Sequence, residues 1–309
     1  MTLAAVTREL LVRYLEVWTP TALHGAKRIT FAYTWSTGDP ASHAESAEAA
    51  LRGFAEFDDL LRSRRLNYLI IGPGAGSIES LEPVQDELKT PPNLAVHAVS
   101  GEPESLLPAA LGAAGAAGAP LLAYAYGAAP PARLYGAGRP TELISVLPPD
   151  SWATHRDALH SRGFTLTTGV EFTAAAPDGG SDRCLVAFAT SRANSLDAFK
   201  NALWAVDEYA GVRYRDPNDP AGHLQDISLA PHPGPLRRAL LGRLAAVGPQ
   251  TVTQLRHYTL TDTIYRSSDA TRVISSLRHA GAVSSGSVHG RLSGDVVVEA
   301  TSAVRRGTA

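Results

Sequence analysis

The glycine-rich segment Gly72-Pro-Gly-Ala-Gly-Ser77 is the part of the sequence best suited to hold a nucleotide. It follows the apolar run 66–71, which is typical of a strand buried on both faces, and it precedes a helix that we expect at 78–88. Glycines at such a turn let the backbone approach a cofactor, and the first amides of the helix can bind an anion. The segment has neither the GxGxxG spacing nor the lysine of a P-loop. A cofactor loop and a plain tight turn with positive φ therefore both stay open.

No other motif points to a familiar active site. The ten histidines are scattered without HExxH spacing, so the sequence predicts no metal site, and we expect His155 and His160 to be exposed on a helix. Cys184 lies in an apparent buried strand, where an inert core thiol is expected rather than a nucleophile. A single cysteine excludes an internal disulfide framework and agrees with a reducing compartment, so we predict a cytoplasmic protein.

Strands and helices are predicted to alternate along the first two thirds of the chain. An amphipathic helix is expected at 6–18, where Thr19-Pro20 should end it, and another is expected at 196–208. Alternation of this kind predicts an α/β domain with a doubly wound, mostly parallel, Rossmann-like sheet, completed by late antiparallel strands. The predicted strands are 28–33, 66–71, 94–99, 120–126, 143–147, 165–173 and 184–189.

The last quarter of the chain has a different pattern. Three helices are expected, followed by two strands around glycine-rich turns within 282–299, and three helices with a β-hairpin predict a winged-helix domain. The helices are expected at 235–247, 251–258 and 268–279. The predicted organisation is a Rossmann-like domain at 1–215, a linker rich in proline and aspartate at 216–233 and a winged helix at 234–309.

Charge is distributed unevenly between these two units. The whole chain carries −2, but residues 234–309 contain ten arginines and only four acidic residues, a balance of +6. A nucleic-acid-binding domain shows such an excess, although a solvated basic surface, a docking surface for another protein or a homodimer interface are alternatives. The residues that we expect to contact DNA are Arg256, His257, Arg272, Arg278 and Arg291.

One uncharged stretch, 106–129, is long enough to span a bilayer. It consists largely of alanine and glycine and contains Pro108 and Pro120, so its transfer into lipid is weakly favourable. We expect a buried helix followed by a buried strand there, and no membrane span. Charged residues between 8 and 16 also interrupt any apolar core of a secretory signal, so no export signal is predicted.

Several segments suggest a family when they are taken in order. They are RELLVRYLEVW (8–18), RITFAYTWSTGDP (28–40), LNYLIIG (66–72), PPNLAVHAVSGE (91–102), LLAYAYG (121–127) and CLVAFATSRANSLDAFKNALWAVDEYAGVRYRD (184–216). Together they resemble the three-Cys-motif partner (TcmP) family of Rossmann-fold, methyltransferase-like proteins. The helical segment that begins at PLRRALLGRLAAVG (235–248) is similar to the terminal module of that family.

The resemblance implies a site for S-adenosylmethionine at the ends of the strands. Proteins of that family carry an acidic residue and a Gly-Pro-Gly element after strand one, an acidic residue at the end of strand two and a DPFG-like loop after strand four. The positions here that match the site, and that would contact the cofactor, are Tyr33, Trp35, Gly38, Gly72, Gly74, Gly76 and Tyr126.

These positions lack the expected carboxylates. A carboxylate at the end of strand two accepts hydrogen bonds from the ribose, and Gly72 cannot replace it. We therefore predict a degenerate, non-catalytic methyltransferase-like protein without a cofactor, which acts as a scaffold or sensor and binds DNA or a partner through the winged helix. The alternative is an active S-adenosylmethionine-dependent methyltransferase with a macromolecular substrate, in which Glu79 or Glu102 supplies the missing acid.

Overall fold

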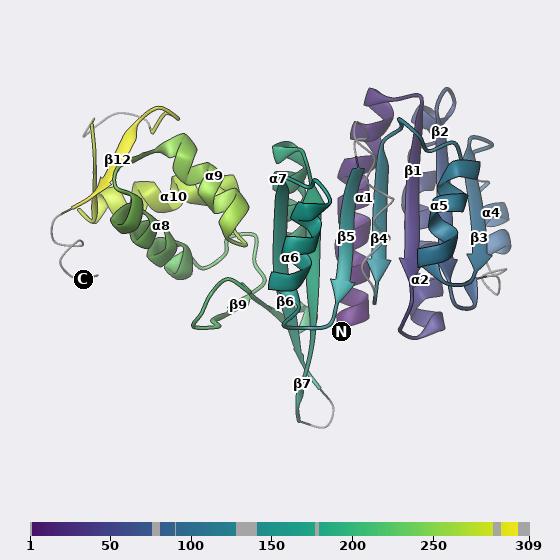
Figure 1. Cartoon of the computed structure of the whole chain (residues 1–309), viewed down its shortest axis with the longest axis horizontal. Coiled ribbons are helices and arrows are strands. Elements are labelled where there is room, and N and C mark those ends of the chain that lie inside the picture. The colour runs from purple at the N-terminus through teal and green to yellow at the C-terminus, as the bar shows by residue number, and fades with distance from the viewer. Residues whose placement is uncertain are drawn as a thin grey trace.

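The chain is a mixed α/β protein with one large central sheet (Figure 1). The computed structural model describes residues 2–75, 81–89, 91–127, 141–176, 179–286 and 292–301. Nine strands lie in the order β3-β2-β1-β4-β5-β7-β6-β8-β9. The first five pair in parallel, and the remaining four pair antiparallel. The strands are β1 Arg28–Trp35, β2 Arg65–Gly72, β3 Leu94–Ser100, β4 Leu121–Tyr126, β5 Thr141–Leu147, β6 Leu166–Ala175, β7 Ser181–Thr190, β8 Val212–Arg215 and β9 Leu224–Asp226.

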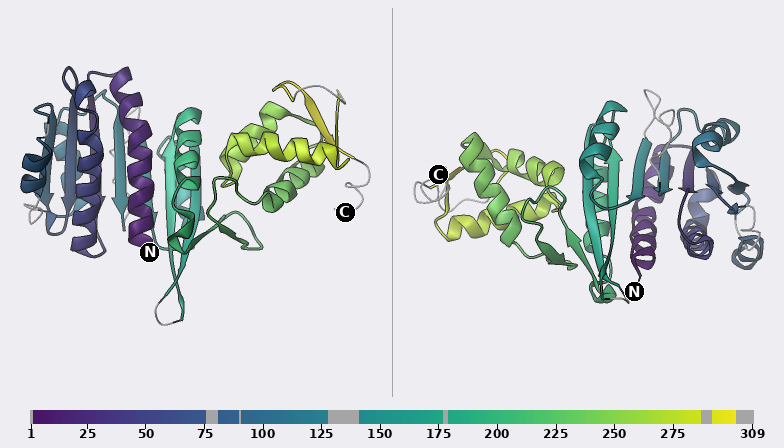
Figure 2. Two further views of the ribbon diagram at one scale, coloured as in Figure 1. Left: turned by 180° about the vertical axis from the view of Figure 1, so that it is seen from behind. Right: turned by 60° about the horizontal axis from the view of Figure 1, so that its bottom comes forward.

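Helices cover both faces of this sheet. Helices α1, α2, α4 and α7 lie on one face, and α5 and α6 lie on the other (Figure 2). This two-sided arrangement confirms the doubly wound sheet expected from the alternation of elements. The helices are α1 Leu3–Gly25, α2 Pro40–Ala55, α3 Asp58–Leu61, α4 Leu81–Leu88, α5 Pro103–Ala113, α6 Trp152–Ser161 and α7 Ala193–Trp204.

The order of the strands defines where a ligand would enter such a sheet. The chain moves outward from β1 to β3 and then returns to the other side of β1 as β4. The parallel strands end at the same edge, the lower one in Figure 1. In open α/β sheets, ligands bind at this edge where the strand order reverses. The crevice between the ends of β1 and β4 is therefore the position to examine for a cofactor.

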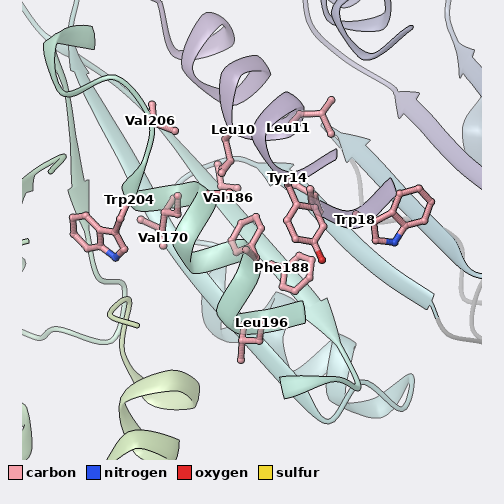
Figure 3. Packing of buried hydrophobic residues seen from close by; sticks show 14 of the residues in the cluster. Leu10, Leu11, Tyr14, Trp18, Val170, Val186, Phe188, Leu196, Trp204 and Val206 are labelled. Carbon is pink, nitrogen blue, oxygen red and sulfur yellow. The ribbon is translucent and has the colours of Figure 1, made fainter. Parts of the chain in front are cut away.

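The core between α1, α7 and the antiparallel strands is aromatic. The ring of Tyr14 lies edge-on to that of Phe188, with 5.2 Å between centroids (Figure 3). Phe188 also stacks on Phe199, with 4.4 Å between centroids. The prediction that Thr19-Pro20 ends the first helix is wrong, because α1 continues to Gly25. Ala22 and Leu23 beyond the proline are 6% and 0% exposed. Their burial outweighs the backbone hydrogen bond that proline removes.

Residues 234–286 and 292–301 form a C-terminal unit of three helices and a small antiparallel sheet. All three predicted helices are present, as are strands before and after the glycine-rich turns. A third strand of two residues, β10, was too short for any sequence periodicity to predict. The elements are α8 Gly234–Val247, β10 Gln250–Thr251, α9 Val252–Asp262, α10 Ser267–His279, β11 Val283–Ser285 and β12 Val297–Ala300.

This unit is attached to α7 of the larger sheet. Lys200 is fully buried, and its Nζ donates to the carbonyl oxygens of Leu260 at 2.5 Å and Tyr265 at 3.1 Å, and also to that of Thr263. The Trp204 indole donates to the carbonyl of Ile264 at 3.0 Å. Within the stretch predicted as a linker, β9 pairs with β8 and extends the sheet. The two units therefore meet through hydrogen bonds as well as through a continuous apolar core.

Within the described residues 106–127, the uncharged stretch forms the later part of α5 and the strand β4, which is buried as expected. The expectation of a buried helix is wrong, because α5 buries only Leu107 and Leu111 and lies at the surface. Among the residues that the structure describes, no helix has both the length and the apolar character needed to cross a membrane.

Candidate functional site

Four aromatic side chains gather where the strand order reverses. Tyr33 and Trp35 alternate along β1, and they lie directly across from Tyr124 and Tyr126 of β4 in the parallel register. Residues two apart in a strand face the same side of a sheet, so all four belong to the α1 and α2 face. The rings of Tyr33 and Tyr124 stack at 5.0 Å with 5° between their planes. Tyr124 was absent from the predicted site, although its spacing of two from Tyr126 placed it on the same face.

Trp35 occupies the space beside Gly72. The indole is 2% exposed, and a Cβ atom on Gly72 would lie 2.3 Å from its Cδ2 atom. No real Cβ atom approaches a neighbour so closely. Residue 72 at the end of β2 is therefore glycine because a tryptophan ring covers its backbone. The same contact fills the place where the backbone of this loop was expected to approach a nucleotide.

His43 of α2 completes the aromatic cluster, which consists of Tyr33, Trp35, His43, Tyr124 and Tyr126. Its imidazole stacks on Trp35 at 4.9 Å and 18°. Nε2 lies 2.8 Å from the carbonyl oxygen of Thr37, and Nδ1 lies 2.9 Å from the hydroxyl of Tyr33. A carbonyl only accepts, so Nε2 carries the proton and Nδ1 accepts from the tyrosine. His43 was counted only among the scattered histidines, and nothing in its spacing placed it here.

Both ring nitrogens of His43 are thus engaged inside the protein. Burial lowers the pKa of His43, which holds the imidazole neutral. Burial also raises the pKa of Tyr33, so its hydroxyl stays protonated. A general base needs a free lone pair within reach of a substrate proton. The cluster offers none on this histidine, and its hydrogen bonds serve to fix the rings.

The loop after β1 closes the crevice from the outside. The Ser36 amide donates to the carbonyl of Tyr126 at 3.0 Å, which ties this loop to the end of β4. Thr37 then lies over Gly127, where a Cβ atom would come within 2.1 Å of the threonine Oγ1. Gly38 and Gly127 both adopt positive φ, 105° and 86°, a region that favours glycine. The two strand ends are therefore bridged by backbone instead of being separated by an open cleft.

A cavity of about 230 Å³ is left beside the cluster. Ligand pockets usually measure roughly 300–1,000 Å³, so this one is small. Asp39 is the one acidic residue of its lining, and Oδ2 accepts from the Ser42 amide at 3.1 Å as the N-cap of α2. Among the residues that the structure describes, neither the volume of this cavity nor its polar groups fit S-adenosylmethionine.

The predicted cofactor positions are largely brought together. Five of the seven lie in or against the cluster: Tyr33, Trp35, Gly38, Gly72 and Tyr126. Gly74 follows in the turn after β2 with φ of 75°, as a tight turn requires. Gly76 and the proposed substitute Glu79 lie outside the described residues. The other substitute, Glu102, is exposed at the start of α5.

The predicted DNA-binding residues lie on the second and third helices of the C-terminal unit. Arg256 and His257 are exposed on α9, and Arg278 is half-buried near the end of α10. Arg272 is exposed, but it donates to the buried Asp269 carboxylate at 2.7 Å, so part of its charge is compensated. Arg291 lies outside the described residues.

Helix α10 presents a surface without carboxylates. Its only acidic residue, Asp269, is 4% exposed and pairs with Arg266 and Arg272. All its exposed or half-buried positions hold serine, threonine, arginine or histidine. The N-terminal end of α10 is docked on α7, where the amide and hydroxyl of Ser267 donate to Asp197 at 3.2 and 2.8 Å. Ser267 is therefore engaged by α7, whereas Ser268 of the same turn is exposed.

Other candidate chemistry is not brought together. No cluster of histidine, cysteine and carboxylates suited to a metal ion occurs within the described part of the chain. Burial raises the pKa of Cys184 to about 12, which fits an unreactive core thiol. The expectation that His155 is exposed is wrong: it is 6% exposed on the inner side of α6, whereas His160 is exposed as predicted.

Comparisons with known proteins find similarity in structure only. No protein-family model and no curated protein matches the chain. One similar solved structure is a precorrin-6y C5,15-methyltransferase from Geobacter metallireducens, with 11% identity over 58% of this chain and 88% of that one, at a TM-score of 0.31. Another is a probable spermidine synthase from Corynebacterium glutamicum, with 11% identity over 67% of this chain and 75% of that one, at a TM-score of 0.32.

Proposed function

We propose that this chain is a degenerate methyltransferase-like protein of TcmP type that transfers no methyl group. Its α/β domain acts as a scaffold or sensor, and its C-terminal winged helix binds double-stranded DNA. The observation that carries the first part is the contact between Trp35 and Gly72, because it fills the cofactor position with a buried side chain.

The fold itself supports a methyltransferase origin. The order β3-β2-β1-β4-β5-β7-β6, with β7 antiparallel to both its neighbours, is that of methyltransferase-type Rossmann sheets. What is missing is the set of charged anchors. A cofactor with a sulfonium and a free amino group needs charge complementarity in a desolvated site. At the ends of β1 and β4, where charged anchors would be needed, the chain has Trp35 and Tyr126.

The C-terminal unit supports the second part of the proposal. Three helices and an antiparallel sheet, whose last two strands lie on either side of 286–296 in the sequence, support the assignment of a winged helix. The accessible face of α10 carries no acidic side chain, so phosphates can approach it without like-charge repulsion. Because Ser267 at the start of the helix is held by Asp197 and the arginines lie further along, the helix contacts DNA mainly through its later turns. Phosphate contacts should then outweigh base readout, which usually uses the first turn.

Fluorescence polarisation with a labelled duplex tests DNA binding. We expect the affinity to fall steeply between about 50 and 200 mM salt, because phosphate contacts release counterions. Arg256→Gln removes an exposed arginine that has no ion-pair partner among the described residues, and it should reduce the salt slope by about 1. Arg62→Gln is the control, because Arg62 follows α3 outside the C-terminal unit, is 73% exposed and already pairs with Asp58 and Asp59; it should leave the affinity and the salt slope unchanged. An affinity that is indifferent to salt and to Arg256 contradicts DNA binding and leaves docking of a protein partner.

A further inference from the structure

A groove lies between α5 and the edge strand β3, on the face of the sheet opposite the aromatic cluster. Its volume is about 500 Å³, which falls within the range of roughly 300–1,000 Å³ that is typical of ligand sites. Its floor is formed by alternate residues of β2 and β3, including Leu69, Ile71 and Val99. Leu69 and Ile71 pack in the same core as α5, which places the floor on the α5 face.

The groove is open because the side chains that face it from α5 and its C-terminal end are small. Leu107 and Leu111 of this helix are buried against the sheet, whereas Ala110, Ala113 and Ala114 line the groove. Methyl groups cannot cover the neighbouring strand, and Val99 is left 38% exposed. The result is an apolar floor with a helix wall along one side.

Two arginines stand together at one end of this groove. Arg28 and Arg65 are the first residues of β1 and β2, they are directly opposite in the parallel register, and both line the groove. Like charges at opposite positions of a sheet repel each other. Neither has an ion-pair partner among the residues that the structure describes, and no lining residue is acidic. His97 adds an imidazole on β3.

The position of Arg28 is fixed by the end of α5. Gly115 follows this helix with φ of 61°, and a Cβ atom there would lie 3.1 Å from the arginine Nη1. The guanidinium therefore rests against the C-terminal end of α5, where the helix dipole favours a cation. This contact holds the charge at the groove instead of leaving it extended in solvent.

We propose that this groove binds a small amphipathic anion. A phosphate or carboxylate head group lies between Arg28 and Arg65, where it relieves their repulsion and accepts charge-assisted hydrogen bonds. A flat apolar body extends along Leu69, Ile71 and Val99. The site is separate from the aromatic cluster and from the C-terminal unit, so its occupation does not depend on DNA binding.

Calorimetric titration of the full chain with 1-naphthyl phosphate and with 1-naphthoate tests the site and separates the two head groups. We expect at least one of them to bind with a dissociation constant below about 1 mM. The neutral probe 1-naphthol should bind about tenfold more weakly or not at all, because it offers nothing to the arginines. Amide shifts in ¹⁵N NMR spectra should be confined to the surroundings of His97, Val99 and Gly115. Absence of binding by both anions, or equal binding of 1-naphthol, overturns the proposal.

Two variants remove the site in different ways. The double variant Arg28→Gln, Arg65→Gln should weaken binding of the anion about tenfold or more. Ala113→Phe keeps both charges but fills the groove from an exposed helix position, and it should weaken binding similarly. Arg213→Gln is the matched control, a strand arginine on β8 that is 58% exposed, and it should bind like the wild type. All titrations are run at one temperature that lies well below the melting temperature of every variant. Unchanged affinity in both groove variants, or an equal loss in Arg213→Gln, contradicts the proposal.

Discussion

The indole of Trp35 lies where any side chain on residue 72 would have to be, with Cδ2 2.3 Å from the position of a Cβ atom. This contact joins the ends of β1 and β2 across the side of the sheet that α2 covers. Both partners are needed, because the ring can approach only a residue without a side chain. A position that was predicted to serve a cofactor is therefore occupied by the packing of the protein itself.

Gly72→Ala should destabilise the protein. The added methyl group collides with a ring that is 2% exposed and stacked on His43, so the ring cannot move freely. Overpacking of this kind costs about 1–3 kcal/mol. Urea denaturation followed by circular dichroism measures the change in the free energy of unfolding.

Gly53→Ala is the matched control for that substitution. Gly53 lies within α2, and a Cβ atom there meets nothing within 4 Å. Replacing a glycine inside a helix with alanine should stabilise by about 0.5–1 kcal/mol. If Gly72→Ala is as stable as Gly53→Ala, the indole does not pack on residue 72 as described.

Lys200 should make the free energy of unfolding increase as the pH rises above neutral. Burial lowers the pKa of Lys200 to about 7 in the folded protein, whereas an unfolded lysine keeps its proton to about pH 10. Between these values the unfolded state binds more protons, so the free energy of unfolding rises with pH. The contribution should approach about 1 kcal/mol per pH unit between pH 7 and 9.

Lys200→Met tests this dependence. Methionine fills a similar volume without a titrating group, so the variant should lose the rise between pH 7 and 9 that the wild type shows. It should also be less stable, because the carbonyls of Leu260 and Tyr265 lose their donor at the end of α9. Equal slopes in the two proteins show that the ammonium stays charged inside its cage of carbonyls.

His155 should make the protein sensitive to acid. Burial lowers the pKa of His155 to about 4, and its Nε2 has no hydrogen-bond partner within the described residues. An unfolded histidine takes up its proton near pH 6.5, so stability falls as the pH drops from about 6.5 to 4. His155→Leu should lose less stability than the wild type between pH 7 and 5 in urea titrations. An identical loss in both proteins excludes a role for this imidazole.

The sequence predicted most of the frame because its periodicities are strong. The buried runs of β2 and β4 and the three C-terminal helices lie within a few residues of their predicted bounds. Proline at position 20 misled the prediction, since burial of Leu23 is a tertiary effect that local propensity does not contain. The prediction that His155 is exposed was wrong for the same reason, because its burial on the inner side of α6 is also a tertiary effect.

The sequence predicted where the site lies in the sheet, but not how its side chains fill it. Departures at Tyr33, Trp35 and Gly72 indicated a lost cofactor site, yet sequence alone could not tell whether these rings filled the space or lined it. His43 joins them through packing between α2 and β1, and no spacing rule predicts that contact. The pairing of Arg28 with Arg65 depends on strand register, which follows only from the assembled sheet.

Binding of the cofactor itself tests the central claim most directly. Isothermal titration of the full chain with S-adenosylmethionine and with S-adenosylhomocysteine should give no heat of binding up to about millimolar concentration, because Trp35 and His43 occupy the crevice between β1 and β4. A dissociation constant in the micromolar range for either compound would contradict the account.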